Sequence, residues 1–303
     1  MVLTGRFCSI LSAILLLLPL GAQAFTCRAG GKELNGSGAA DVMVTLTPQL
    51  QPNENLVVNL GESIQCKNDL PQSYLDPVRI GEASAYSGAL ANFTGSISYF
   101  GQTYPFPIQA GGATHWENHT WGEYQPWNVT LYLKATGAAG GVVINQGELF
   151  ASLKLEKKDN DGSINQTIIW NLIAANSVIV PTGGCNVSSP NINVLLPDYP
   201  GTSPVDLTVH CAQSQNLNYY LTGTTADAGN TIFTNVASIS PAQGVGVRLR
   251  NSSGILAANQ QVSMGSVGTS ETTLGLTAEY GLTGPQLTAG NVQSIIEVTF
   301  IYP

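Results

Sequence analysis

The sequence predicts an all-β protein, and three observations support this class. Charged residues make up only 10% of the 303 residues, whereas globular domains average about 25%. Apolar and polar residues alternate in windows such as 129–133 and 205–209, as strands with one buried face require. No window keeps the apolar period of an amphipathic helix over three turns. Turn pairs such as Asn35-Gly36 separate the windows, which is typical of β-sandwiches.

The first 24 residues are predicted to be an export signal. Arg6 precedes an apolar run over 10–20, which ends at the A-x-A pattern of 22–24, the order of a cleavable signal peptide. A membrane-spanning helix needs roughly 20 apolar residues, about twice this run. We therefore expect the mature chain to begin at Phe25 and to be exported. Its acidic balance, a formal −8 before Arg6 is lost, argues against a nucleic-acid partner.

Four cysteines remain after removal of the signal. They form two pairs along the chain, Cys27 with Cys66 and Cys185 with Cys211. Sequence alone allows three connectivities, and sequential pairing is expected if each pair belongs to its own domain. Each bridge would then stabilise its domain by roughly 2–4 kcal/mol. No Cys/His spacing predicts zinc, and no cofactor motif is present.

A domain boundary is predicted at 181–184, where Pro-Thr-Gly-Gly follows a strand-like run and precedes a new cysteine. The chain then divides into a domain of residues 25–180, a linker at 181–184 and a domain of residues 185–303. Each domain is long enough to bury its own core.

The chain ends in a strand with a regular alternation. Side chains of successive strand residues point to opposite faces, so Ile296, Val298, Phe300 and Tyr302 share one face. The opposite face, with Ile295 and Ile301, is also largely apolar. Such a terminal strand is an aggregation hazard unless a partner strand covers its edge, although it would also suit the closing strand of an ordinary sandwich.

Catalytic motifs are nearly absent. His115, Glu117 and His119 bring two imidazoles and a carboxylate together, but their spacing is not HExxH, and no helix is expected there. A secreted glycosidase would need two carboxylates across a cleft, which Asp69 and Asp76 could provide. Hydrolysis of an aryl galactoside would test this alternative, and we expect none.

Aromatic residues cluster in the segment 116–127. A ring can pack against the C–H face of a sugar while its polar edge stays hydrated. Trp127 precedes a clearly alternating strand and is expected in the core. Trp116 and Trp121 are therefore the candidates for the rim of a sugar site.

The chain resembles the FimH-like two-domain fimbrial tip adhesins over essentially all of its mature length. Gly290, fourteenth from the end, and the penultimate Tyr302 match the C-terminal signature of pilins. Matching segments in the C-terminal half are 181–185 (PTGGC), 196–201 (LPDYPG), 214–217 (SQNL), 224–230 (TTADAGN) and 242–247 (AQGVGV), and in the N-terminal half 66–69 (CKND), 84–88 (SAYSG), 104–107 (YPFP), 140–144 (GGVVI) and 170–171 (WN).

The resemblance implies an elongated β-sandwich lectin domain of jelly-roll, immunoglobulin-like form, followed by an incomplete immunoglobulin-like pilin domain that lacks its last strand. A periplasmic chaperone would lend the missing strand until the next fimbrial subunit replaces it at the outer-membrane usher. Such β-augmentation takes affinity from main-chain bonds and specificity from side-chain pockets. The chaperone is expected to pair with the terminal strand and to clamp the carboxylate of Pro303. The protein would then act at the fimbrial tip on the bacterial surface.

The resemblance also implies a sugar pocket that uses the free amine of the first mature residue, Phe25. An unperturbed α-amino group has a pKa of about 7.7–8.0, so it would donate as a cation at neutral pH. Asn68, Asp69 and Asp76 match pocket positions of the family. Asp76 is the side chain we expect to matter most, because a carboxylate can accept from two adjacent hydroxyls.

Departures from the mannose-specific pattern bear on the sugar. Lys157 and Asp159 replace a Gln and an Asn, and Ile164-Asn165 replaces an Asp-Asp pair. Leu70 and Asp161 replace two gate tyrosines, although Tyr74 restores an aromatic residue nearby. A Lys at this position followed by a loop Asn is similar to FmlH, the member that takes terminal galactose or N-acetylgalactosamine. We therefore favour that class of host glycan and keep mannose as the alternative, and we expect Lys158, Asp161 and Gln166 to be solvated.

Two further hypotheses concern the whole chain. A purely structural fimbrial subunit would need one domain and would leave the other unexplained. Relatives behave as catch-bond adhesins, so docking of the pilin domain could hold the pocket in a weak state that tension relieves. The sequence specifies neither the exact glycan nor the host tissue.

Overall fold

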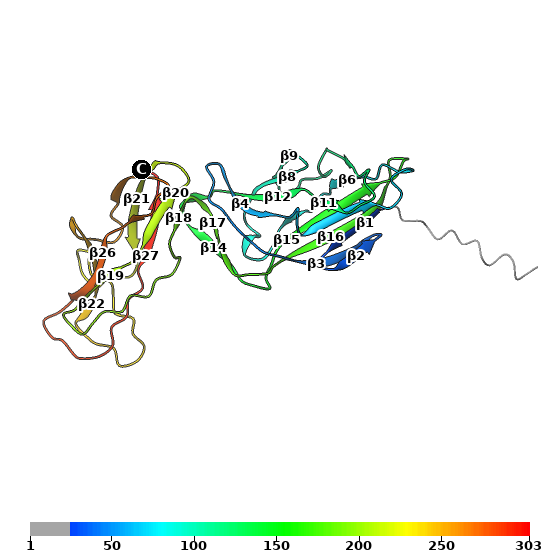
Figure 1. Ribbon diagram of the computed structural model, residues 1–303. Coiled ribbons are helices and arrows are strands. Elements are labelled where there is room, and N and C mark those ends of the chain that lie inside the picture. Colours follow the sequence, from blue (N-terminus) through cyan, green and yellow to red (C-terminus); the bar gives the residue numbers. More distant parts are fainter. Residues whose placement is uncertain (1–24) are drawn as a thin grey trace, which may run out of the picture.

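The computed structural model describes residues 25–303, so the expected signal in 1–24 lies outside the described residues. This part of the chain contains strands, one short 3₁₀ helix, η1 (Gly88–Leu90), and no α-helix, which confirms the all-β class. No helix among the described residues has the length and apolar character needed to cross a membrane. Figure 1 shows an elongated molecule in which two groups of strands meet near β14 (Gly141–Ile144) and β17 (Val178–Pro181).

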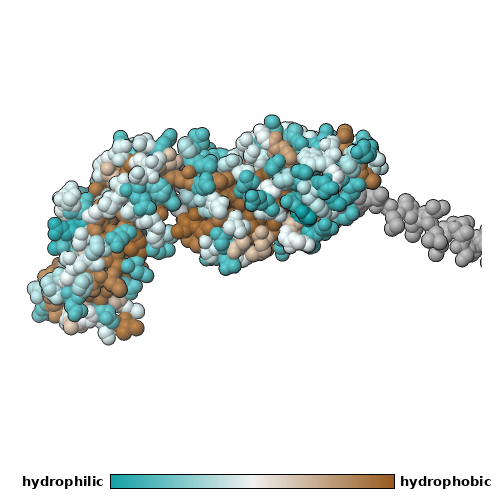
Figure 2. Space-filling model, viewed as in Figure 1, coloured by the Kyte–Doolittle hydropathy of each residue, from teal (hydrophilic) through white to brown (hydrophobic). Residues whose placement is uncertain are grey.

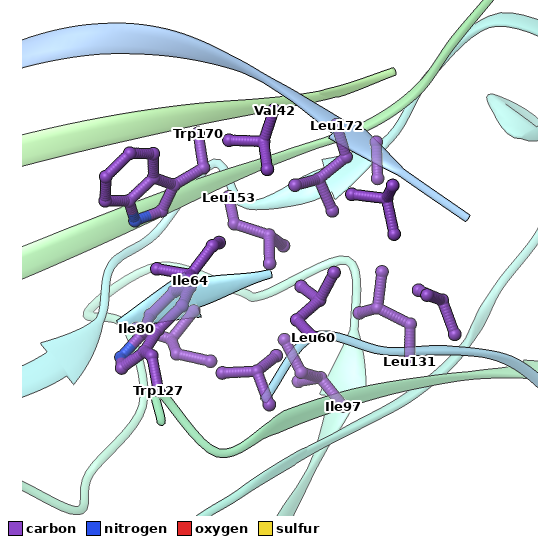
Figure 3. Close-up of a cluster of buried hydrophobic side chains, with 14 of the residues drawn as sticks. Val42, Leu60, Ile64, Ile80, Ile97, Trp127, Leu131, Leu153, Trp170 and Leu172 are labelled. Atoms are coloured by element: carbon purple, nitrogen blue, oxygen red, sulfur yellow. The ribbon is translucent and has the colours of Figure 1, made fainter. Parts of the chain in front are cut away.

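The first group of strands encloses one hydrophobic core that runs from Phe25 to Val180. Trp127 and Trp170 are fully buried in it, as expected for Trp127, and Figure 3 shows both with aliphatic side chains from several strands. Its sheets are β11 (Gln125–Pro126), β5 (Ile64–Asn68), β1 (Phe25–Ala29) and β2 (Lys32–Asn35); β10 (Glu117–Asn118), β6 (Pro77–Ile80), β15 (Leu149–Lys158), β16 (Ile164–Ala174) and β3 (Gly38–Val44), with β7 (Ala85–Tyr86) also on β15; and β4 (Glu54–Asn59), β12 (Val129–Lys134), β8 (Gly95–Tyr99) and β9 (Gln102–Phe106).

A disulfide links β1, the strand that begins at Phe25, to β5. β1 pairs with β2 on one side and β5 on the other, and Phe25 lies opposite Asn68. Cys27 and Cys66 face each other across β1 and β5 and are bonded. Phe25 and Asn68, both expected at the sugar site, therefore lie opposite each other on two strands that a disulfide links.

Strands from the first group also reach the second. β13 (Gly137–Ala139) pairs in parallel with β18 (Gly183–Val187), and Ala138 is buried in the core of the second group. β14 (Gly141–Ile144) pairs with β17 (Val178–Pro181) just before this junction. Asn55, 1% exposed, donates from Nδ2 to the carbonyls of Pro181 and Gly183, both at 2.9 Å. The predicted linker at 181–184 is thus held by buried hydrogen bonds.

The second group of strands forms its own core, and Cys185 and Cys211 are bonded across β18 and β20, as sequential pairing predicts. The expected strand at 205–209 is wrong. A tight turn from Leu207 N to Val205 O, 2.8 Å, breaks it and moves the chain between sheets. The sheets are β13, β18, β20 (Thr208–Cys211) and β25 (Thr272–Thr273); β19 (Thr202–Val205), β26 (Leu276–Leu282), β22 (Val245–Asn251) and β23 (Gly254–Ile255); and β24 (Val262–Val267), β21 (Gln215–Thr222) and β27 (Glu297–Ile301).

The C-terminal strand β27 lies at the edge of its sheet. It pairs with β21 on one side, and no strand among residues 25–303 forms a ladder with its other side. Two extended segments, 191–197 and 292–296, also lie outside any ladder. Their half-buried side chains lie against the second core, and Figure 2 shows apolar residues at the surface of this group. The half-buried residues of these segments and of β27 include Ile192, Val194, Leu196, Val292, Ile296 and Val298.

The predicted inner face of β27 is buried to different degrees along the strand. Phe300 is 7% exposed and packs near Tyr219, whereas Tyr302 is 46% exposed. Ile295, on the opposite face, is 73% exposed. The end of the strand therefore offers both backbone groups and apolar side chains to a partner.

Candidate functional site

Phe25 is anchored by its backbone and by its ring. Gln166 is 5% exposed, and its Nε2 donates to the carbonyls of Phe25, 3.3 Å, and Gly36, 3.1 Å. The expectation that Gln166 is solvated is therefore wrong, because its amide donates to two buried carbonyls, one in β1 and one in the bend between β2 and β3. An unsatisfied buried polar group costs about 1–3 kcal/mol.

The ring of Phe25 packs edge-on against the imidazole of His119, with centroids 5.2 Å apart. Phe100 meets the same imidazole edge-on, and Trp121 stacks on it at 5.0 Å. Burial lowers the pKa of His119 to about 4, so its imidazole is neutral at pH 7. His119 is therefore a buried, neutral packing residue whose ring supports the ring of Phe25.

Asn68 holds the loop that precedes Asp76. Its Nδ2 donates to the carbonyls of Tyr74, 2.6 Å, and His119, 2.8 Å, and its Oδ1 accepts from the N–H of Leu70. Three of its four hydrogen-bonding positions are thus occupied. The structure brings Asn68 to the site, but mainly as a residue that shapes the loop.

Asp69 lies beside the first strand. Its Oδ2 accepts from the hydroxyl of Thr26 at 2.6 Å, and its Oδ1 pairs with Lys67 at 2.8 Å. The carboxylate is partly exposed. Asp69 therefore lies beside β1 with both of its oxygens already in contact with neighbours.

Asp76 and Lys157 form a buried ion pair. Lys157 Nζ lies 3.0 Å from Oδ1 of Asp76, and the two residues are 6% and 3% exposed. Oδ2 of Asp76 is buried and has no hydrogen-bond partner within residues 25–303. Burial raises the pKa of Asp76, and the Lys157 ammonium opposes this. Asp76 also has a positive φ of 42°, a strained conformation that often marks functional sites.

The hairpin of β15 and β16 supplies Lys157. The pairing register shifts between Lys157 and Lys158, so a bulge lies at the end of β15. Bulges re-aim side chains and are common beside functional sites. Asn165 accepts a long bond of 3.5 Å from Lys157, and Asp159 stays in the exposed turn, where it accepts from the N–H of Asn160. Of the three hairpin residues predicted for the site, Lys157 is the one that is buried.

Apolar side chains surround this polar site. Tyr74 is 39% exposed, and Leu70, Leu75 and Ile164 are between 41% and 54% exposed. Trp121 is half-buried on His119. The sequence analysis identified Tyr74 and Trp121 and named Leu70 and Ile164 as departures from the mannose-specific pattern, but it missed Leu75, whose only signal was an apolar side chain in a loop.

The other candidate groups do not form a metal-binding or catalytic site among residues 25–303. No group of His, Cys, Asp and Glu side chains there could hold a metal ion. His115 Nε2 lies 2.9 Å from Glu117, while the ring of His119 is taken up by the aromatic cluster. A surface cavity of about 530 Å³ lies over β8 and β9, away from every residue expected to bind sugar.

Comparisons with known proteins identify close relatives. The family model described as "FimH, mannose binding" matches residues 27–171. The chain is 49% identical over 299 residues to the "Type 1 fimbrin D-mannose specific adhesin" of Escherichia coli K12, covering 98% of this chain and 99% of the relative. It is 38% identical to the "S-fimbrial protein subunit SfaH" of an Escherichia coli O6 strain, covering 92% and 97%.

Among solved structures, the CupB6 tip adhesin from Pseudomonas aeruginosa matches with a TM-score of 0.31 and 15% identity, covering 92% of this chain and 95% of that one. A chaperone–tip subunit complex of the Csu pili of Acinetobacter baumannii matches with a TM-score of 0.27 and 11% identity, covering 91% and 100%.

Proposed function

The chain belongs to the FimH family of fimbrial adhesins, and on this premise we propose that it attaches the bacterium to host glycans through the site formed by Phe25, Asp76 and Lys157. As a member of this family it is an adhesin of the fimbria at the cell surface, exported by the chaperone-usher route, and not an enzyme. These coarse expectations of the sequence analysis are confirmed.

The unpartnered oxygen of Asp76 is the observation that supports the site best. A buried carboxylate oxygen without a donor is costly, and such atoms in folded proteins call for an explanation. A sugar hydroxyl that donates to Oδ2 would satisfy it. The other oxygen is held by Lys157, so Asp76 would accept one strong bond from the ligand and would be fixed in place by its partner.

The mature N-terminus would complete this site. Cleavage before Phe25 would free an α-amino group on the strand whose carbonyl is held by Gln166 and whose ring is held by His119. Asp69, bonded to the neighbouring Thr26, lies close enough to that end of the strand to balance the new charge.

Terminal galactose or N-acetylgalactosamine is the sugar class that we favour. Lys157 adds a cation to the pocket and occupies one of the two oxygens that Asp76 could otherwise offer to a pair of hydroxyls. Mannose is the second candidate, and the 49% identity to an adhesin named as mannose-specific favours it.

We further propose a lectin domain of residues 25–180, a linker at 181–184 and a pilin domain of residues 185–303 that a donor strand completes. The edge of β27 and the two extended segments that lie outside any ladder support this. A periplasmic chaperone and then the next subunit would fill the groove, with Ile296, Val298 and Phe300 facing it and Pro303 at its end. The buried junction at β13 and Asn55 would let tension on the fimbria separate the domains and strengthen binding.

The test is glycan binding by the full chain that begins at Phe25, recovered with its chaperone. Wild type is compared with Asp76→Asn and with Asp161→Asn, an exposed carboxylate bonded within its own turn. We expect Asp76→Asn to weaken binding at least a hundredfold, because a bond to a charged acceptor and its partner ion pair are both lost. Asp161→Asn should bind as wild type. Signal on galactosides supports the favoured sugar, signal on mannosides the alternative, and silence on all glycans contradicts the proposal.

A further inference from the structure

A row of cations lies on the outer face of the sheet that holds Lys157. Arg79 in β6 pairs in register with Glu156 in β15, and Lys154 and Lys158 flank Glu156 along the same strand. Alternate residues of a strand share a face at about 6.6–6.8 Å intervals. Lys154 and Glu156 follow this interval, and Lys158 comes after the bulge that ends β15 but on the same side, because it shares the ring of Trp116 with Arg79.

Two of these cations share one carboxylate. Arg79 contacts Oε2 of Glu156 at 2.8 and 2.9 Å, and Lys154 contacts Oε1 at 2.7 Å. Glu156 is 4% exposed, whereas the Lys154 side chain is 30% exposed. The carboxylate lies beneath the cations, so the side that faces solvent carries positive charge.

Lys158 has a different neighbour. Its ammonium lies 4.5 Å from the ring centroid of Trp116, and the guanidinium of Arg79 lies 4.6 Å from the same ring. Among residues 25–303, Lys158 makes no ion pair. Both cations lie over the ring of Trp116, which is only partly exposed, so cation–π contacts hold the two charged groups together at one place on the surface.

Nearby carboxylates are engaged elsewhere. Asp159 and Asp161 accept from backbone N–H groups of their own turn, and Glu82 accepts from the N–H of Gly111. None of them pairs with a cation of the row. Neutralisation of Glu156 accounts for one positive charge, but it does not account for three cations, two of which lie over a partly exposed tryptophan.

The row begins beside the proposed sugar pocket. Lys157 turns inward to Asp76, and its neighbour Lys158 turns outward to Trp116, at the bulge that ends β15. Consecutive Cα atoms are about 3.8 Å apart. A glycan whose terminal sugar enters the pocket could therefore continue over Lys158 and along the row.

We propose that Trp116, Lys158, Arg79 and Lys154 form a second subsite, which binds an anionic substituent on the glycan, the carboxylate of a sialic acid or a sulfate ester. The subsite deepens the proposed function, because it rests on the same terminal-sugar pocket and adds a preference for acidic host glycans. Trp116 holds Arg79 and Lys158 beside each other through its ring, and Lys158 supplies a cation that no carboxylate of the described chain neutralises.

The test compares neutral and acidic forms of the same glycan. The probes are N-acetyllactosamine, its sialylated form and its 3-O- and 6-O-sulfated forms, together with a trimannoside with and without a sulfate ester. The full processed chain, with its chaperone, is measured as wild type, Lys158→Gln, Lys154→Gln and the matched control Lys134→Gln, an exposed lysine on β12 in another sheet.

In wild type we expect at least one acidic form to bind roughly fivefold more tightly than its neutral parent at 0.05 M salt, as one close pair of charges in water would give. At 1 M salt, where the screening length is about 3 Å, this preference should vanish. Lys158→Gln should abolish the preference and keep the affinity for the neutral glycan. Lys134→Gln should change neither, and the sialylated and sulfated arms distinguish the two anions.

If wild type binds the neutral glycans and binds their acidic forms no more tightly, the subsite is wrong and the proposed function still stands. A preference that survives in both Lys158→Gln and Lys154→Gln would also overturn it, because the charge would then be recognised elsewhere. Binding of no probe by wild type would overturn the subsite together with the proposed function.

Discussion

The two ends of the molecule are built for recognition in opposite ways. At the Phe25 end, Asn68, Asp76 and Lys157 are buried and hydrogen-bonded or ion-paired, and within residues 25–303 one carboxylate oxygen of Asp76 has no donor. At the β27 end, the chain offers a strand edge and apolar side chains, with few charges. The first end can select a ligand by the position of single atoms, whereas the second can select a partner by strand pairing and by the pattern of its side chains.

This difference predicts where a change of one side chain matters. At the Phe25 end, preorganised groups should make binding sensitive to single hydrogen bonds. At the β27 end, main-chain bonds are the same for any sequence, so only substitutions that point into the groove should matter.

The largest effect is expected for Val298→Asp. Val298 is half-buried against the second core, and a carboxylate placed there would lose its hydration without a partner, which costs several kcal/mol. We expect the exported chain no longer to be recovered as a complex with its periplasmic chaperone, a loss of more than a hundredfold in affinity. Recovery by co-purification from the periplasm measures this.

Thr299→Asp is the matched control, because Thr299 is the next residue and points to the other face of β27. It should keep the complex. Sugar binding by any Val298→Asp chain that remains folded should equal wild type. If both substitutions abolish the complex, the side-chain pattern of the inner face is not what the chaperone recognises.

The next largest effect concerns the pH dependence of stability at the Phe25 end. The folded state holds the pKa of His119 at about 4, whereas an unfolded histidine has a pKa of about 6.5. As the pH falls through 6.5, the unfolded chain takes up a proton that the folded chain refuses. The free energy of unfolding should therefore decrease between pH 6.5 and 4, by about 3 kcal/mol in total from this residue.

His119→Phe keeps the aromatic packing and removes the titration. Relative to this variant, wild type should lose about 3 kcal/mol between pH 6.5 and 4, while the raised pKa of Asp76 affects both chains alike and cancels. All four tryptophans lie in the first group of strands, so denaturant unfolding followed by tryptophan fluorescence reports this domain. Parallel pH profiles for the two chains would contradict the assignment.

Sequence reasoning reached the fold and part of the site. Alternation along 129–133 predicted buried Val129, Leu131 and Leu133, because a strand with one buried face leaves a period-2 pattern. The same rule failed at 205–209, where a three-residue turn moves the chain between sheets without disturbing the alternation. Local pattern is insensitive to such a turn.

The site shows the same limit. Matching positions to a family identified Asp76 and Lys157, and the structure pairs them. Sequence reasoning placed Gln166 in solvent, because its role depends on two carbonyls more than a hundred residues away in the chain. It likewise treated Lys158 as solvated, although Lys158 lies on Trp116, which directly precedes β10. Contacts between distant segments decide both cases.

The smallest effect is expected for Gln166→Leu, which keeps the volume of the side chain and removes its amide. The carbonyls of Phe25 and Gly36 would lose a buried donor, so the free energy of unfolding should fall by about 1–2 kcal/mol. Because Phe25 carries the proposed N-terminal amine, sugar affinity should also fall several-fold. Thr167→Val, at the next and more exposed position, is the control and should change neither quantity. A Gln166→Leu chain that loses stability but keeps full affinity would show that Phe25 is positioned by the β1 ladder and the ring of His119 alone.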